Sequence, residues 1–229
     1  MINRRKFMTH AAASLLPTPF LSKNVWAVEA GMPLPIPPVL ELDGGAGNVL
    51  DAMAGKHGFS PGRTTRTLGF SQDYLGPVLR MKRGQTSKIT VRNRTNDLIT
   101  AHWHGLHVPG IVDGGPQLAF APGQTWSPEL EIDQPASTLW YHSHVHGRTA
   151  EQVYAGLAGM IFIDDPDGQK EELPSNYGVD DLPLIVQDKA FDEDASLIYV
   201  KRGPSLMHGF RANLIVVNGA IRPAATVPA

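Results

Sequence analysis

Residues 85–93 have the sequence QTSKITVRN, and this stretch decides the fold class of the 229-residue chain. Its apolar residues Ile89 and Val91 alternate with polar neighbours, among them Lys88 and Arg92. Successive side chains of a β-strand point to opposite faces, so such alternation is typical of a strand with one buried face. We therefore predict a half-buried strand over residues 85–93.

Similar short runs follow this stretch along the chain. Turn-forming residues separate them, notably DGGP at residues 113–116 and APG at residues 121–123. No long amphipathic helix is expected, and one short helix is predicted near Thr149–Ala155. Many short strands divided by turns indicate an all-β protein built as a β-sandwich. The further predicted strands are residues 98–104, 125–132, 138–144, 159–163, 182–188, 196–200 and 213–217.

The composition limits the chemistry that the chain can carry out. It contains no cysteine, which excludes disulfides, thiolate nucleophiles and cysteine-ligated metal sites. The charges of its 20 basic and 22 acidic residues nearly cancel, so nothing indicates electrostatic binding to nucleic acid. The 23 glycines and 19 prolines favour turns and short strands over long helices.

The first thirty residues have the pattern of an export signal. Arg4 and Arg5 precede an apolar stretch at residues 11–21, which is too short to span a bilayer and is interrupted by Pro17 and Pro19. A paired arginine before such a stretch predicts a twin-arginine signal peptide. We therefore expect a periplasmic location and no stable membrane anchor.

Two His-x-His pairs are the most informative residues, namely His102 with His104 and His142 with His144. Residues two apart on a strand share a face and lie about 6.6 Å apart along the backbone, which suits imidazoles that reach neighbouring metal ions. Neutral imidazole binds copper, zinc, iron and nickel. The His-Glu-x-x-His motif of zinc peptidases does not occur. The spacing predicts a transition-metal site and leaves the identity of the metal open.

The residues around both pairs resemble the copper motifs of the multicopper oxidase family. The first motif is matched by HWHGLHVPGIVDGGPQ at residues 102–117, and the second by WYHSHVHG at residues 140–147. The similarity is greatest to the bacterial laccase-like branch that includes the cuprous oxidases of copper efflux. It implies a cupredoxin (plastocyanin-like) Greek-key β-sandwich, and it extends from about Pro33 to Pro223.

The resemblance also implies roles for five residues. His102 would be a ligand of the type 2 copper. His104, His142 and His144 would be ligands of the type 3 copper pair. Asp113 would help to deliver protons during dioxygen reduction, in addition to forming the turn that its sequence predicts.

Other residues near the pairs are interpreted as structural. Trp103 and Trp140 are expected to pack in the core. His107 and His146 match no ligand position of the family, so we expect them to support the ligands or to face solvent.

The chain departs from the complete family pattern, which has four histidine motifs and a type 1 copper site built on a cysteine. Without a cysteine or a later histidine motif, it would supply half of the histidine ligands of a trinuclear cluster and no type 1 site. The predicted organisation is a signal peptide at residues 1–30, a first cupredoxin domain at 31–165, a linker at 166–182 and the incomplete start of a second cupredoxin-like domain at 183–229.

Two functions agree with these observations. The first is that of the N-terminal part of a multicopper oxidase, which takes electrons from a cuprous ion, a phenol or an aromatic amine and reduces dioxygen to water. Its partners would then be the missing C-terminal oxidase domains. The alternative is a non-enzymatic periplasmic copper-binding protein. A third hypothesis, a purely structural cupredoxin-like protein of the cell envelope, does not need intact histidine pairs.

Overall fold

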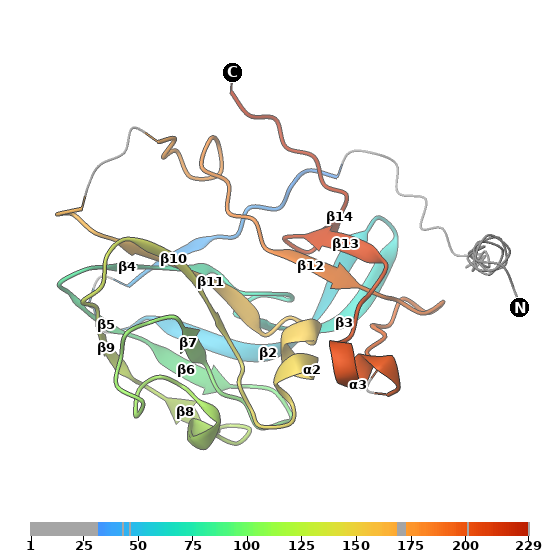
Figure 1. The fold of residues 1–229 in the computed structure, drawn as a ribbon, viewed down its shortest axis with the longest axis horizontal. Coiled ribbons are helices and arrows are strands. Elements are labelled where there is room, and N and C mark those ends of the chain that lie inside the picture. Colours follow the sequence, from blue (N-terminus) through green and yellow to red (C-terminus); the bar gives the residue numbers. More distant parts are fainter. Residues whose placement is uncertain (1–31, 43, 46, 169–172, 201, 229) are drawn as a thin grey trace, which may run out of the picture.

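The structure is a computed structural model that describes residues 32–42, 44–45, 47–168, 173–200 and 202–228. The predicted signal peptide and residues 169–172 of the predicted linker lie outside the described residues. Strands dominate, as predicted, and the helices are short (Figure 1). The first elements are β1 (Val39–Glu41), β2 (Val49–Ser60), β3 (Arg63–Phe70), β4 (Val78–Lys82), β5 (Thr86–Lys88), β6 (Thr90–Asn93), β7 (His102–His104), η1 (Pro116–Leu118) and β8 (Thr125–Trp126). They are followed by β9 (Glu129–Glu131), β10 (Ser137–His142), α2 (Thr149–Ala155), β11 (Ala158–Asp164), β12 (Val186–Lys189), α3 (Pro204–His208), β13 (Leu214–Val217) and β14 (Ala220–Ile221).

The first sheet has five strands in the order β1-β4-β11-β10-β7. β10 pairs antiparallel with β11 on one side and with β7 on the other, whereas β4 is parallel to β1 and β11. Within the described part of the chain, β7 pairs with β10 alone. The first histidine pair therefore lies on an edge strand of three residues.

The second layer is a four-stranded sheet in the order β3-β2-β6-β8, and β5 and β9 form a two-stranded sheet. The stretch at residues 85–93 lies here, with Ile89 and Val91 buried and Lys88 exposed, so the predicted half-buried strand is confirmed. It is divided into β5 and β6 at Ile89. The adjacent segment, between β8 and β9, contains Pro128 at this point, and proline has no N–H for the strand ladder.

The two layers pack face to face around one apolar core, as in a β-sandwich. Trp103 and Tyr141 are two of its largest completely buried side chains, and they lie opposite each other on β7 and β10. Because side chains alternate along a strand, the residues flanking Trp103 and Tyr141 point away from this core. The packing of these two aromatic side chains thus sets the direction of the histidines.

A three-stranded sheet in the order β12-β13-β14 packs against the first sandwich through a second apolar cluster. The hairpin of β13 and β14 turns at Asn218 and Gly219, whose φ angles of 50° and 84° fit the Asn-Gly turn of a tight hairpin. The carbonyl oxygen of Gly219 lies 2.7 Å from Nε2 of His57 on β2. The cluster consists of Phe59, Tyr74, Leu75, Ala158, Val216 and Ile221.

Several elements differ from the sequence predictions. The strand predicted at residues 98–104 begins only at His102, and residues 196–200 form no strand beyond an isolated bridge between Leu197 and Phe191. β2 and β3 were not predicted, because glycines such as Gly55 and Gly58 weaken the strand pattern of β2. The predicted short helix is confirmed by α2 (Thr149–Ala155). No helix among the described residues has the length and apolar character needed to cross a membrane.

Candidate metal centre

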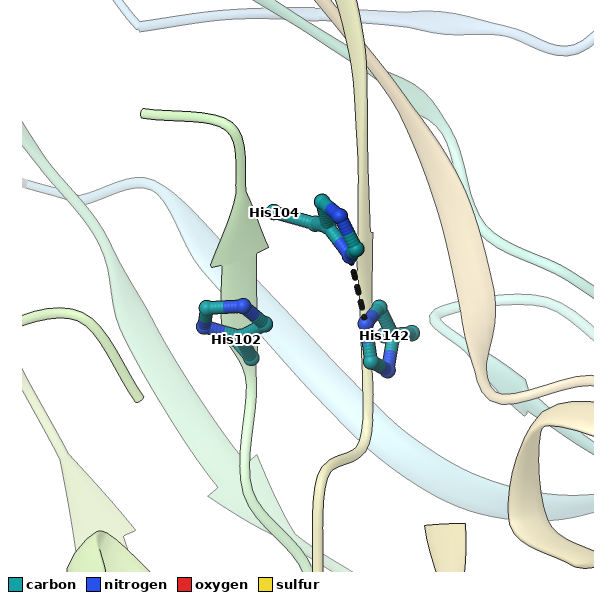
Figure 2. Close-up of side chains that lie close together, drawn as sticks. All are labelled: His102, His104 and His142. Atoms are coloured by element: carbon teal, nitrogen blue, oxygen red, sulfur yellow. Dashed lines mark hydrogen bonds between the residues drawn. The ribbon is translucent and has the colours of Figure 1, made fainter. Parts of the chain in front are cut away.

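Four histidine side chains gather at the β7 edge of the first sheet. His102 and His104 are the ends of β7, and His142 is the last residue of β10, directly opposite His102. Figure 2 shows the rings of His102 and His104 from one strand close to that of His142 from its neighbour. Ligand nitrogens of these three histidines all lie within 4.8 Å of one another.

His144 completes the group from the turn that follows β10. Its ring centroid is 5.1 Å from that of His102 and 5.4 Å from that of His142. Its Nδ1 is the one buried side-chain nitrogen or oxygen, among the described residues, that has no hydrogen-bond partner. Leaving a buried polar atom unpaired is costly, so this atom fits a site that holds a ligand.

Hydrogen bonds to carbonyl oxygens fix the tautomers of two of the rings. Nδ1 of His102 lies 2.8 Å from the carbonyl oxygen of Asp113, and Nδ1 of His142 lies 2.9 Å from that of Ser143. A carbonyl oxygen can only accept, so each Nδ1 carries the hydrogen and donates. Nε2 of each ring is therefore left with a lone pair, and the bond from Nδ1 to a carbonyl oxygen orients the ring so that this lone pair can bind a metal.

The spacing of His104 and His142 suits a single ion. Nδ1 of His104 lies 3.3 Å from Nε2 of His142 (Figure 2). Imidazole–metal bonds of about 2.0–2.1 Å in a tetrahedral arrangement place two ligand nitrogens about 3.3 Å apart. A donor set made of imidazoles favours copper or another borderline transition metal over calcium or magnesium. The residues present therefore fit a copper site.

Asp113 lies against His102. One of its carboxylate oxygens is 3.3 Å from Nδ1 of His102. Burial raises the pKa of the Asp113 carboxyl, and the nearby histidines partly oppose this effect. The next residue, Gly114, has a φ of +73°, and a Cβ there would overlap the carbonyl oxygen of Ala101. Glycine thus allows the Asp113 loop to lie directly on the backbone that leads into β7.

Trp140 corrects the sequence interpretation. Trp103 is completely buried, as predicted, but Trp140 is 38% exposed and does not pack in the core. Its ring stacks on His142 at 4.0 Å and on His104 at 5.0 Å between centroids. Trp140 is two residues before His142 on the same strand, so alternation places it on the histidine face. His107 and His146 are exposed.

A family model described as "Multicopper oxidase" matches residues 53–168, a span that contains all four histidines and Asp113. The chain belongs to the multicopper oxidase family. The family and the fold support copper as the metal and oxidoreductase activity as the chemistry of the relatives, which use dioxygen and a reductant. The absence of cysteine agrees with the absence of a type 1 copper site from this multicopper oxidase chain.

Curated relatives of this multicopper oxidase chain carry two kinds of name. It is 39% identical to multicopper oxidase mco of Staphylococcus aureus over 198 residues, which cover 86% of this chain and 43% of that protein. It is 36% identical to cell division protein FtsP of Xenorhabdus nematophila over 226 residues, which cover 97% of this chain and 46% of that protein. The chain thus spans about half the length of the curated relatives that it matches.

A solved structure confirms the cupredoxin-like fold. The bacterial laccase-like multicopper oxidase CueO from Ochrobactrum sp. superposes with a TM-score of 0.81 and is 43% identical in sequence. The match covers 86% of this chain and 44% of that protein. The Greek-key β-sandwich expected from the sequence is therefore the fold of this part of the family.

The metal-free chain is expected to lose stability in mild acid because of His142. Burial lowers the pKa of His142 from 6.5 to about 4. Between these values the unfolded chain binds a proton that the folded chain does not, so the free energy of unfolding falls as the pH falls, by at most about 3 kcal/mol. Urea unfolding at several pH values in this window should show a flatter dependence for His142→Gln than for the parent chain. Equal dependences would contradict this expectation, and the exposed His146→Gln serves as the control.

Proposed function

We propose that this chain supplies part of the copper site of an exported oxidase that takes electrons from a reductant and reduces dioxygen to water. The observation that carries the proposal is the convergence of four imidazoles, with nitrogens of His104 and His142 3.3 Å apart. His102 would be a ligand of the type 2 copper. His104, His142 and His144 would be ligands of the type 3 pair, and the unpaired Nδ1 of His144 supports its inclusion.

Copper, when bound, would supply the one-electron chemistry that dioxygen reduction requires, and the chain would supply orientation and protons. The Asp113 carbonyl holds His102 in the tautomer that leaves Nε2 available. The Asp113 carboxyl, with its raised pKa, would hold a proton beside the metal centre and supply it to the oxygen that is reduced there. Trp140 covers the rings of His142 and His104 on one side and limits the access of water to them.

The reductant would be a cuprous ion, a phenol or an aromatic amine. The Ochrobactrum relative is described as having oxidase activity towards lignin model compounds and lignosulfonate, which supports a phenolic class. The relatives are about twice as long as this chain, so sequence outside it would provide the type 1 site and the remaining ligands. The twin-arginine pattern of residues 1–30 supports export to the periplasm.

A second candidate is a non-enzymatic role in the periplasm. It is favoured by the 36% identity to a cell division protein, which extends over 97% of this chain. A copper carrier would keep the histidine site without dioxygen chemistry, whereas a structural protein would not need the site at all. Copper affinity and oxygen consumption therefore separate the three possibilities.

Loss of His104 or of His142 is expected to abolish tight copper binding. The metal-free chain would be titrated with Cu(I) in competition with bicinchoninate. His104→Ala and His142→Ala should each weaken binding by more than the roughly 10–100-fold that the loss of an outer-shell partner costs. His146→Ala is the matched control, because His146 is exposed and lies two residues beyond the second pair. Unchanged affinity in both ligand variants would contradict the assignment.

Oxygen consumption decides between the oxidase and the carrier. An oxygen electrode would follow the copper-loaded protein, in a version that includes the rest of its oxidase, with a cuprous salt or a dimethoxyphenol as the reductant. Dioxygen uptake that is lost in His142→Ala supports the oxidase. Full copper loading without uptake would instead support the carrier.

A further inference from the structure

One buried side chain, Gln152 on α2, is hydrogen-bonded to the segments that carry both histidine pairs. Its Nε2 donates to the carbonyl oxygen of Leu98, four residues before His102, at 2.7 Å. Its Oε1 accepts from the hydroxyl of Ser143, the residue between His142 and His144, at 2.6 Å. Gln152 is only 3% exposed, so its side chain is shielded from water.

The Ser143 hydroxyl connects this glutamine to the backbone on both sides of the site. It accepts a hydrogen bond from the backbone N–H of Thr100 at 3.1 Å, and the Thr100 hydroxyl accepts one from the N–H of His144 at 2.7 Å. Ser143 and Thr100 are completely buried. A buried network in which every member is satisfied is rigid and holds its segments in one arrangement.

Secondary structure alone does not fix these segments. β10 ends at His142, and beyond it one backbone bond continues the pairing, from the N–H of Ser143 to the carbonyl oxygen of Leu157, whereas the N–H of His144 donates to the Thr100 hydroxyl. The strand β7 is a three-residue edge strand, and residues 98–101 before it form no strand beyond an isolated bridge between Ile99 and Phe120. Short edge strands and turns have few backbone constraints. The side-chain network therefore adds a constraint to the few backbone bonds of these segments, and it is the one that joins them to each other through Gln152.

We propose that Gln152 is a positioning residue of the metal centre. It fixes the segment that leads to His102 relative to the turn that carries His142 and His144, so that the imidazoles meet at the spacing of an ion. It acts through Leu98 and Ser143 and does not contact the imidazoles. This inference rests on the copper-binding function proposed above.

The test is the copper affinity of Gln152→Leu. Leucine keeps most of the buried volume and removes both hydrogen bonds of the side chain. We expect Cu(I) binding, in competition with bicinchoninate, to weaken by about 10–100-fold, the usual cost of losing an outer-shell partner. The spectrum of the Cu(II)-loaded variant in electron paramagnetic resonance should broaden, because the ligands are no longer held in one geometry. Glu151→Gln, one residue earlier on the same helix, is the matched control and should bind copper like the parent chain.

A second variant keeps the test decisive if Gln152→Leu does not fold. Ser143→Ala leaves the Gln152–Leu98 bond and removes the shared hydroxyl, and it should weaken copper binding to a similar extent. In the double variant the two losses should not add, because both changes break one network.

The outcomes separate this inference from the proposed function. If the parent chain binds copper and His142→Ala does not, an affinity within about twofold of the parent for folded Gln152→Leu and Ser143→Ala would overturn the role of Gln152 alone. If the parent chain and His142→Ala bind copper equally weakly, this result contradicts the proposed copper-binding function. The positioning role of Gln152 is then contradicted as well.

Discussion

Replacing Lys189 with methionine is expected to remove most of the rise in the free energy of unfolding between pH 7 and about pH 10. Lys189 lies on β12 and is completely buried. Its ammonium donates to the carbonyl oxygen of Tyr154 and lies 4.0 Å from the centroid of the Tyr154 ring and 5.6 Å from that of Tyr74. Aromatic rings and one carbonyl oxygen compensate only part of the cost of burying the charge.

The direction of this effect follows from the protons that each state binds. Burial lowers the pKa of Lys189 from 10.5 to about 7, and the neighbouring Asp188 opposes the shift only partly. Between these values the unfolded chain keeps a proton that the folded chain lacks, so stability rises with pH, by at most about 5 kcal/mol. Above pH 10 the unfolded tyrosines begin to ionise. Burial raises the pKa of Tyr74 and raises that of Tyr154 to about 12, which reverses the trend.

Urea unfolding at pH 7, 8 and 9 would measure this effect. The control is Lys88→Met, because Lys88 is exposed and paired with Glu129 on the surface. We expect Lys88→Met to keep the pH dependence of the parent chain and Lys189→Met to lose it. A parallel rise in all three proteins would show that Lys189 is not the group that titrates.

Truncation of Trp103 to alanine is expected to lower the free energy of unfolding by about 3–5 kcal/mol, the range for large aromatic side chains in cores. Trp103 is completely buried, and its ring is stacked at 6.0 Å on that of Trp126. Its indole N–H donates to the carbonyl oxygen of Val112 at 3.0 Å, and this partly buried acceptor would lose its partner. Both the cavity and the unpaired carbonyl act in the same direction.

Chemical unfolding of Trp103→Ala beside Trp140→Ala tests this expectation. Trp140 has the same size, but it is 38% exposed and stacks on histidines instead of filling the core. Its truncation should cost less than that of Trp103, because part of the ring is already in water and no core cavity is left. Equal losses in the two variants would contradict the view that Trp103 is the core residue that orients the histidine strand.

The sequence predicted that His102 and His104 lie on the side of the strand opposite to Trp103, because the alternation of side chains along a strand is a local rule. His102 and His104 flank Trp103, so burial of the tryptophan fixes the direction of both histidines. The same rule could have placed Trp140 beside His142, two residues along β10. The sequence interpretation treated Trp140 as core because it judged the residue by its type and not by its position on the strand.

Other features depend on contacts that local patterns do not contain. β2 and β3 escaped prediction because their glycines weaken the alternation, and only pairing with each other and with β6 defines them as strands. No pattern in the sequence indicated that the polar residues Gln152 and Lys189 are buried in the interior. Their partners lie 54 and 35 residues away in the chain, at Leu98 and Tyr154.

The sequence by itself determined the all-β class, the two histidine pairs and the copper motifs, because each of these depends only on neighbouring residues and on their alternation. The tertiary structure alone decided that Nδ1 of His104 and Nε2 of His142 meet 3.3 Å apart, across 38 residues of chain. It also decided that Gln152 connects both pairs. Such distances arise from the packing of the two sheets around Trp103 and Tyr141. A closely packed core fixes the positions of atoms, whereas the structural preferences of neighbouring residues do not specify distances between distant segments.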